Sequence, residues 1–407
     1  MNAIGVPDGF DVRDDRVARA AWSRIAEPGD QAAGYVVAQL GAAPALLALF
    51  ERQAELRAFA ASARSSTPRR GAPAPGAGWL ERVPQADPRR DLATLQRFGG
   101  RLVVPGDLEW PAGLAPLELR TPFALWVRGP ADLAGACRRS VALVGSRAST
   151  RYGEWVAREL GTGCAERGIT VVSGAAYGID AEAHLGALRA GGLTVAILAC
   201  GVDRAYPRGN EPLIERMTRC GLVVTEIPPG SSPSRWRFVQ RNRLIAALTR
   251  ATVVVEAGWR SGASITAGEA QRLGRDTAAV PGPVTSAASA GCHRLLRDGA
   301  VCVTDAAEVA ELVGAIGEAP APGGRAPSAD HDGLDDVDLR VFDALPIRAT
   351  VGVERLAGTA GLDVSTVIGA VGRLELRGLA VREGGLWRRR PRRSRRADGG
   401  SGPADGP

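Results

Sequence analysis

The sequence contains no lysine, and this absence excludes several kinds of chemistry. All 51 basic residues of the 407-residue chain are arginine. An ordinary P-loop NTPase needs a lysine beside the phosphates, and Schiff-base catalysis needs a lysine amine, so both classes are excluded. Only three histidines are present, which leaves few options for histidine-based catalysis or for a zinc site.

Two further absences concern the cellular compartment. None of the six cysteines forms a C-x-x-C pair, and several lie in apolar runs, so we expect reduced, buried thiols and no metal site. No apolar run approaches the ~20 residues that span a membrane. The N-terminal segment lacks the basic start and apolar centre of a secretory signal. We therefore expect a cytoplasmic protein that does not act at a membrane.

The positive charge is concentrated at one end of the chain. The net charge is +7, but residues 388–396 hold seven arginines and no acid. Without this stretch the remainder is close to neutral. We expect a basic, disordered tail at 391–407, which either attracts nucleic acid loosely or is merely solvated.

The most informative stretch is residues 141–180. Apolar runs at 141–144 and 169–172 flank an amphipathic segment at 153–167. This order predicts a strand, a helix and a second strand of one parallel sheet.

Small polar residues follow both predicted strands. Gly145, Ser146 and Arg147 follow the first, and Ser173 and Gly174 follow the second. In open parallel sheets, ligands bind at the carboxyl ends of the strands. Arg147 places a permanent positive charge there, so we expect an anionic ligand.

Apolar strands and amphipathic helices continue to alternate up to residue 314. This pattern predicts an α/β fold with a Rossmann-like, doubly wound, mostly parallel sheet. The predicted parts are a small N-terminal helical domain at 1–64, a flexible insert at 65–91, the core with its run-in at 92–314, a linker at 315–333, and a winged helix-turn-helix at 334–390. Winged helices usually bind duplex DNA, but many dock proteins, and the sequence leaves both uses open.

Residues 234–243, SRWRFVQRNR, combine four arginines with two aromatic residues. This mixture suits single-stranded nucleic acid, because guanidinium groups bind phosphates and rings stack on bases. Trp236 and Phe238 could equally be core residues. Hydroxyl groups of Ser149, Ser173 and Ser261 could add contacts.

Arg241 and Arg243 should not be equivalent, because residues two apart in a helix point about 200° from one another. The apolar positions of the helix predicted over 241–250 place Arg241 nearer its buried side. We therefore predict that Arg243 faces the ligand, whereas Arg241 is structural and turns to a carboxylate such as Glu226 or Glu256.

Two rival interpretations find little support. The first loop reads G-S-R-A-S and lacks the later glycines of a dinucleotide-binding G-x-G-x-x-G loop. No serine–histidine–aspartate set or paired carboxylates stand out: Asp180 is interpreted as a helix N-cap, and Glu226 and Glu256 as partners of arginines. We expect no catalytic residues, no cofactor and no metal.

The chain resembles the bacterial DNA-processing protein A family (DprA, also called Smf). The resemblance covers the whole α/β core and rests on VALVGSRAST, VVSGAAYGIDAEAH, ILACGVDRAYPRGN, TEIPPGSSP, RFVQRNRLIAALT, VVVEA, SGASITAGEAQRLGR and AVPGPVTSAASAGCHRLLRDGA. There are two small departures. Val239 stands where the family commonly has proline, and Cys292 where it often has asparagine.

The resemblance implies a core that binds single-stranded DNA without sequence preference and protects incoming strands in natural transformation. It implies dimerisation through the core, transfer of DNA to the RecA recombinase, single-strand-binding protein as a further partner, and no catalytic turnover. The expected DNA-binding residues are Gly145, Ser146, Arg147, Ser149, Ser173, Gly174, Arg235, Arg237, Phe238, Arg241, Asn242, Arg243, Ser261 and Gly262.

The alternative function is a nucleotide-processing enzyme, such as a phosphoribohydrolase, on a similar sheet. Enzymes of that kind carry a P-G-G-x-G-T loop beside a glutamate. The corresponding loop here, Pro281-Gly282-Pro283-Val284, lacks that sequence.

Overall fold

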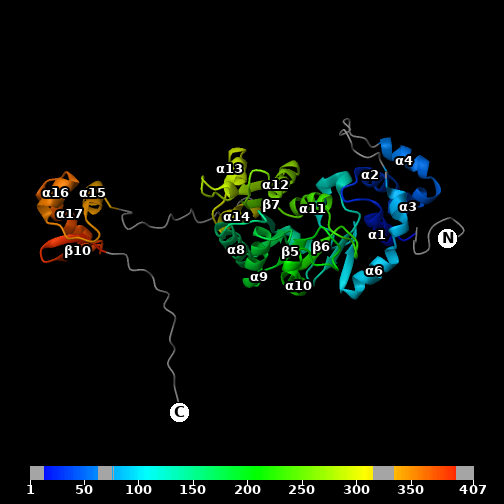
Figure 1. Cartoon of the computed structure of the whole chain (residues 1–407), viewed down its shortest axis with the longest axis horizontal. Helices are drawn as coiled ribbons and strands as arrows, with labels where there is room; N and C mark the ends of the chain where they lie inside the picture. Colours follow the sequence, from blue (N-terminus) through cyan, green and yellow to red (C-terminus); the bar gives the residue numbers. More distant parts are fainter. Residues whose placement is uncertain (1–12, 63–75, 77, 315–333, 391–407) are drawn as a thin grey trace, which may run out of the picture. The chain divides into compact units, whose positions relative to one another are not determined.

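The computed structural model describes residues 13–62, 76, 78–314 and 334–390 (Figure 1). The chain divides into two compact units between residues 321 and 322. The predicted linker at 315–333 and the basic tail at 391–407 lie outside the described residues.

A nine-stranded sheet forms the centre of the first unit, with the order β1-β2-β6-β5-β4-β3-β7-β8-β9. Its strands are β1 (Gly100–Val103), β2 (Leu125–Arg128), β3 (Ser140–Gly145), β4 (Thr170–Ser173), β5 (Thr194–Ile197), β6 (Leu222–Thr225), β7 (Ala251–Glu256), β8 (Asp276–Ala279) and β9 (Val301–Cys302). The strands from β6 to β9 along the sheet run parallel, and β1 and β2 pair antiparallel at one edge. The predicted mostly parallel α/β sheet is confirmed.

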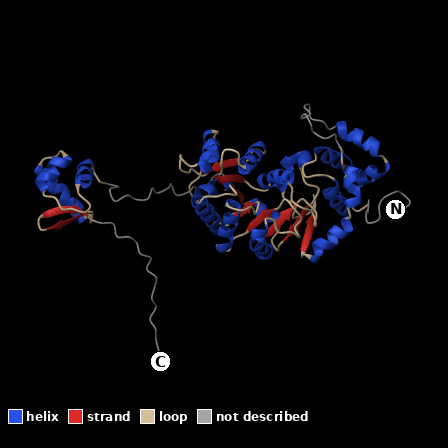
Figure 2. Ribbon diagram, in the orientation of Figure 1, coloured by secondary structure: helices blue, strands red, loops and turns tan. Residues whose placement is uncertain are grey.

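Helices cover both faces of this sheet (Figure 2). They are α7 (Leu133–Arg138), α8 (Arg151–Glu166), α9 (Ile179–Arg189), α10 (Glu211–Cys220), α11 (Arg235–Ala247), α12 (Gly262–Arg272), α13 (Ala290–Arg297) and α14 (Ala306–Val313). Successive residues of a strand point to opposite faces. In β3, Ala142 and Val144 therefore pack in the core with α11 to α13, whereas Val141 and Leu143 pack with α8, α9 and α14.

The N-terminal helices α1 (Asp15–Ile25), α2 (Gln31–Leu40), α3 (Ala42–Glu51) and α4 (Gln53–Ser62) form a cluster with its own apolar core. This cluster belongs to the same unit as the sheet. Trp22 of α1 packs edge-on against Trp79, with ring centroids 5.4 Å apart. No single described helix is long and apolar enough to cross a membrane; α2 and α3 together pass that test by length and composition, but they meet at 109°.

The second half of the predicted flexible insert is ordered, so that prediction is wrong for residues 79–91. They form α5 (Trp79–Arg82), a 3₁₀ turn (Val83–Gln85) and the start of α6 (Pro88–Arg97). Trp79 is fully buried, and its indole donates a 2.8 Å hydrogen bond to Asp30. Low sequence complexity continues only up to Gly78, and a single large aromatic residue is enough to anchor the segment that begins with it.

The second unit contains α15 (Asp336–Ala344), α16 (Val353–Ala360), α17 (Val364–Leu376), β10 (Ala380–Glu383) and β11 (Leu386–Arg389). The two strands pair antiparallel around Gly384 and Gly385, which both have positive φ. A two-residue hairpin turn favours that backbone conformation. Three helices and a hairpin are therefore present where the sequence predicted them, while the winged-helix assignment remains a prediction.

Candidate nucleic-acid interface

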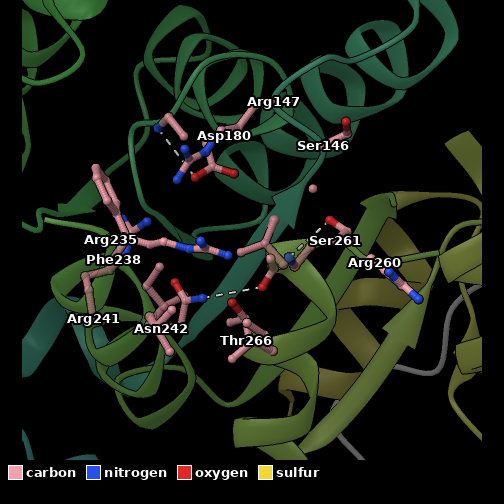
Figure 3. A pocket seen from close by; sticks show the side chains of 18 of the residues that line it. Ser146, Arg147, Asp180, Arg235, Phe238, Arg241, Asn242, Arg260, Ser261 and Thr266 are labelled. Carbon is pink, nitrogen blue, oxygen red and sulfur yellow. Dashed lines mark hydrogen bonds between the residues drawn. The ribbon is translucent and has the colours of Figure 1, made fainter. Parts of the chain in front are cut away.

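A pocket of about 820 Å³ opens at the carboxyl edge of the sheet. It is bordered by the loops after β3, β4, β5 and β7, by residues 235–245 of α11 and by residues 262–266 of α12 (Figure 3). The lining residues include nine of the fourteen predicted site residues: Gly145, Ser146, Arg147, Arg235, Phe238, Arg241, Asn242, Ser261 and Gly262.

The loop after β3 is held against the end of β7. Gly145 leaves no room for a side chain, because a Cβ atom there would lie 2.5 Å from Ile179. The Ser146 amide donates to the Glu256 carbonyl at 2.7 Å. The Glu256 carboxylate in turn accepts hydrogen bonds from the Thr150 amide and hydroxyl, at 2.8 and 2.7 Å. The expectation that Glu256 pairs with an arginine is therefore wrong: it fixes the loop that carries Arg147.

Phe238 lies at the centre of a cation–aromatic cluster on the pocket wall. The Arg147 guanidinium lies 4.9 Å from the Phe238 ring centroid, and that of Arg241 lies 6.0 Å away. The Tyr206 ring is 5.6 Å from the same ring. Guanidinium groups and rings that gather in this way suit a ligand with both phosphates and aromatic bases.

Arg241 reaches the pocket from a buried position. Only 5 % of the residue is exposed, and its Nη1 donates to the Ile197 carbonyl at 2.5 Å. A Cβ atom on Gly174 would overlap with this guanidinium, so only glycine fits at that position. Burial lowers the Arg241 pKa to about 10, against the opposing attraction of Asp180. At neutral pH the guanidinium is charged.

Asp180 is the one acidic side chain among the described lining residues. Its carboxylate accepts hydrogen bonds from the amides of Gly174 and Ala176, at 3.1 and 3.5 Å. Burial raises its pKa, and nearby Arg241 opposes that rise. The predicted N-cap role is wrong, because α9 begins at Ile179 and its N-cap is Gly178. Asp180 instead holds the loop after β4.

The prediction that Arg243 faces the ligand is wrong. Arg243 is 1 % exposed, does not line the pocket, and forms a bidentate ion pair with Glu226, with both distances 2.6 Å. It also donates to the Arg120 carbonyl at 3.0 Å. The prediction that the two differ is confirmed, as is the Glu226 partner, but Arg243 is the structural residue. Residues 241–247 are all buried, so the helix has no solvent face that could distinguish them.

Four further predicted residues lie beside the pocket without lining it. Ser149 donates to Glu154 at 2.9 Å and Ser173 to the Leu143 carbonyl at 2.6 Å. Arg237 pairs with Glu27 at 3.1 Å, which ties α11 to the N-terminal helices. Gly174 makes room for Arg241. These four residues influence the shape of the pocket through the residues that they contact.

The family model described as "DNA recombination-mediator protein A" matches residues 101–314, which contain the whole pocket. The chain belongs to this family.

Three known proteins illustrate the similarity. A putative DNA processing protein DprA from Mycobacterium tuberculosis is 49% identical over 308 residues, which cover 73% of this chain and 79% of that protein. The DNA processing protein DprA of Streptococcus pneumoniae is 40% identical over 188 residues, which cover 46% of this chain and 66% of that protein. The X-ray structure of DNA processing protein A from S. pneumoniae aligns with a TM-score of 0.58 at 28% identity, over 73% of this chain and 96% of that one. The family resemblance seen in the sequence is confirmed.

Sequence reasoning missed several lining residues, among them Tyr206, Arg260 and Thr266. Arg260 could have been found, because it follows β7 at the same edge as Arg147 follows β3. Thr266 lies one turn after Gly262 in α12, so helical spacing placed it on the same side. No local signal marks Tyr206, which reaches Phe238 from the loop after β5.

The arginines at the mouth of the pocket lack acidic partners. Arg147, Arg235 and Arg260 are exposed, and none forms an ion pair with any residue that the structure describes. Unneutralised guanidinium groups around an open pocket attract anions. No group of three or more described histidines, cysteines or acids could hold a metal ion.

Proposed function

We propose that the pocket binds single-stranded DNA without sequence preference and that the protein is a cytoplasmic recombination mediator. The observation that carries this proposal is the Arg147 guanidinium 4.9 Å from the Phe238 ring, in a pocket rimmed by arginines that have no acidic partner among the described residues. Backbone phosphates would contact the arginines, and a base would stack on the ring. None of these contacts depends on which base is present.

Single strands fit this arrangement better than duplex. In a duplex the bases are stacked and paired inside the helix, so their faces cannot reach a ring within a pocket. A single strand exposes its bases and can bend its backbone toward several arginines. The pocket should therefore favour flexible, unpaired DNA.

The family supports a wider role. Its description names recombination mediation, and relatives are named DNA processing proteins. From these names and the site we propose that the chain protects incoming strands in natural transformation and hands them to the RecA recombinase. Dimerisation through the core and contact with single-strand-binding protein belong to the same proposal.

The test compares fluorescence anisotropy of a labelled single strand, the matching duplex and a mononucleotide. We expect preference for the single strand, with log affinity falling against log salt by about 0.7 per phosphate contact. Preference for duplex at moderate salt, or a flat salt response, would contradict the proposal. Release of free base from a nucleoside monophosphate would instead favour the phosphoribohydrolase alternative.

A further inference from the structure

The N-terminal helices contact the segment of chain that leads into the pocket. Residues 228–234, which we call the lead-in loop, lie between β6 and α11, and α11 carries Arg235 and Phe238 to the pocket wall. Pro233 and Ser234, at the end of this loop, line the pocket as well. Figure 1 shows the N-terminal helices on the side of the core where α11 lies. Contacts that fix the lead-in loop therefore also fix the first turn of α11.

Arg24 of α1 holds the first half of the lead-in loop. Its Nη2 donates to the Pro229 carbonyl at 2.7 Å. Asp91 of α6 orients the same guanidinium through hydrogen bonds of 2.7 and 2.9 Å, and only 3 % of Asp91 is exposed. Pro229 is itself buried, and a buried carbonyl that loses its donor is costly. Without Arg24, the loop would have to move before water could reach this carbonyl.

Glu27, in the turn between α1 and α2, holds the second half of the loop. Its carboxylate accepts hydrogen bonds from Nε and Nη2 of Arg237, at 3.2 and 3.1 Å. Nη1 of Arg237 in turn donates to the Ser232 carbonyl at 2.9 Å. Gly29 lies so close to α11 that a Cβ atom there would overlap with the Gln240 side chain. The N-terminal helices therefore contact both the lead-in loop and the first two turns of α11.

The opposite side of the lead-in loop is held less firmly. There the Gly230 amide donates to Asp203 at 2.9 Å, and Arg204 donates to the Ser232 hydroxyl at 3.2 Å. Both hydrogen bonds are exposed to water, whereas the bonds of Arg24 are partly buried. A hydrogen bond is stronger where water is excluded. The N-terminal helices thus supply the firmer of the two sets of contacts.

We propose that the N-terminal helices position the DNA-binding segment, with Arg24 as the principal positioning residue and Glu27 as the second. This inference rests on the proposed binding of single-stranded DNA. Both residues lie outside the described pocket lining, so they act through the lead-in loop. A loop that is already ordered loses little conformational entropy when the strand binds. The N-terminal helices raise the affinity in this way without touching DNA.

The experiment measures single-strand binding by anisotropy for Arg24→Met combined with Asp91→Asn, at a temperature where circular dichroism shows a folded protein. The double variant keeps the net charge, so the overall attraction to DNA is unchanged. We expect about 10-fold weaker binding, or ~1.4 kcal/mol, because the strand would have to order about one backbone residue of the loop. The salt slope should stay the same, because no phosphate contact is lost. Hydrogen exchange of residues 228–237 should become faster.

Arg16 of α1 provides a matched control. It pairs with Asp107 at 2.7 Å and donates to the Leu102 carbonyl at 2.7 Å, so it too joins an aspartate to a backbone carbonyl. Leu102, however, lies in β1 and not in the lead-in loop. Arg16→Met combined with Asp107→Asn should leave the affinity and the hydrogen exchange of the loop unchanged, whatever it does to the melting temperature.

Glu27→Gln tests the second contact and also serves where the Arg24 double variant does not fold. The Glu27 side chain is 35 % exposed, so the fold should tolerate the change. Loss of a negative charge alone would strengthen DNA binding. Positioning predicts the opposite, roughly 2- to 5-fold weaker binding, the scale of an exposed ion pair. Unchanged or stronger binding by this variant would contradict the positioning role of Glu27.

Equal weakening by the Arg24 and Arg16 double variants would overturn the proposal, as would an unchanged affinity of the Arg24 variant. A salt slope smaller by about 0.7 would overturn it too, because Arg24 would then contact a phosphate directly. If the wild type fails to bind a single strand at all, the proposed function itself fails. Hydrogen exchange would still show in that case whether the N-terminal helices order the lead-in loop.

Discussion

Two surfaces of the molecule carry arginines and differ in what surrounds them. At the carboxyl edge of the sheet, Arg147, Arg235 and Arg260 form no ion pair with the described residues. In the second unit, Arg373 of α17 is paired with Asp338 at 2.7 Å. The number of arginines therefore says little about an anion site. What decides is whether a carboxylate already neutralises each guanidinium.

The exposed face of α17 reinforces this contrast. Val364 is 42 % exposed, Ile368 56 % and Leu376 91 %. These apolar side chains lie among the exposed polar residues Ser365, Arg373 and Glu375, so α17 presents a mixed surface, whereas the helix that reads duplex DNA usually presents polar and basic groups to it.

We expect the largest effect on folding from Arg243→Ala, because Arg243 is the arginine with a buried acidic partner. It would leave the Glu226 carboxylate buried without its partner, which typically costs about 3–5 kcal/mol. Urea unfolding followed by circular dichroism measures the loss. Replacing the pair together, with Arg243→Met and Glu226→Leu, should regain most of it. A loss below about 1 kcal/mol, the value of a surface pair, would show that the pair is not structural.

Arg147→Ala tests the opposite case, an exposed arginine without an acidic partner. Loss of a charge-assisted contact of about 1.5–3 kcal/mol should weaken single-strand binding roughly 10- to 100-fold. The melting temperature should barely change. Arg219→Ala is a suitable control, because Arg219 is exposed at the end of α10, outside the pocket lining. An equal loss in both variants would mean that only overall charge matters.

These two residues also show what could be predicted from sequence. The strands, the sheet edge and the place of Arg147 could be predicted, because their signals are local. Each strand is an apolar run that ends in glycine and small polar residues. The roles of Arg241 and Arg243 depend on contacts with Ile197 of β5 and with Glu226, which follows β6, and neither contact is visible in the local sequence. Helix faces could not separate these two arginines for a further reason: α11 begins at Arg235, well before the predicted start at Arg241, and is buried on all sides from 241 to 247.

The two units should also differ in their response to acid. Burial lowers the pKa of His184 to about 3, from about 6.5 in the unfolded chain. Because the unfolded state takes up the proton first, stability is present above pH 6.5 and is lost as pH falls. At pH 5 the loss is about 2 kcal/mol. Residues 334–390 contain no histidine.

The measurement is unfolding free energy at pH 7 and pH 5 for the wild type and for His184→Gln. The variant should lose less stability than the wild type over this interval, whatever its stability at pH 7. Asp180, whose pKa burial raises, acts in the opposite direction in both proteins, so the difference isolates His184. Identical pH profiles would place the acid sensitivity elsewhere.

The smallest expected effect is that of the second unit on single-strand binding. A chain ending at residue 390 lacks the basic tail, and one ending at residue 321 also lacks the second unit, so the two differ only by residues 322–390. Because Arg373 is already paired with Asp338 and α17 exposes apolar side chains, both proteins should bind a single strand with affinities within about 2-fold, roughly 0.4 kcal/mol. Their salt slopes should also agree, since no phosphate contact is lost. If the affinity of the shorter chain depends less steeply on salt, residues 322–390 supply phosphate contacts. The arginines of the second unit would then bind DNA as those of the pocket do.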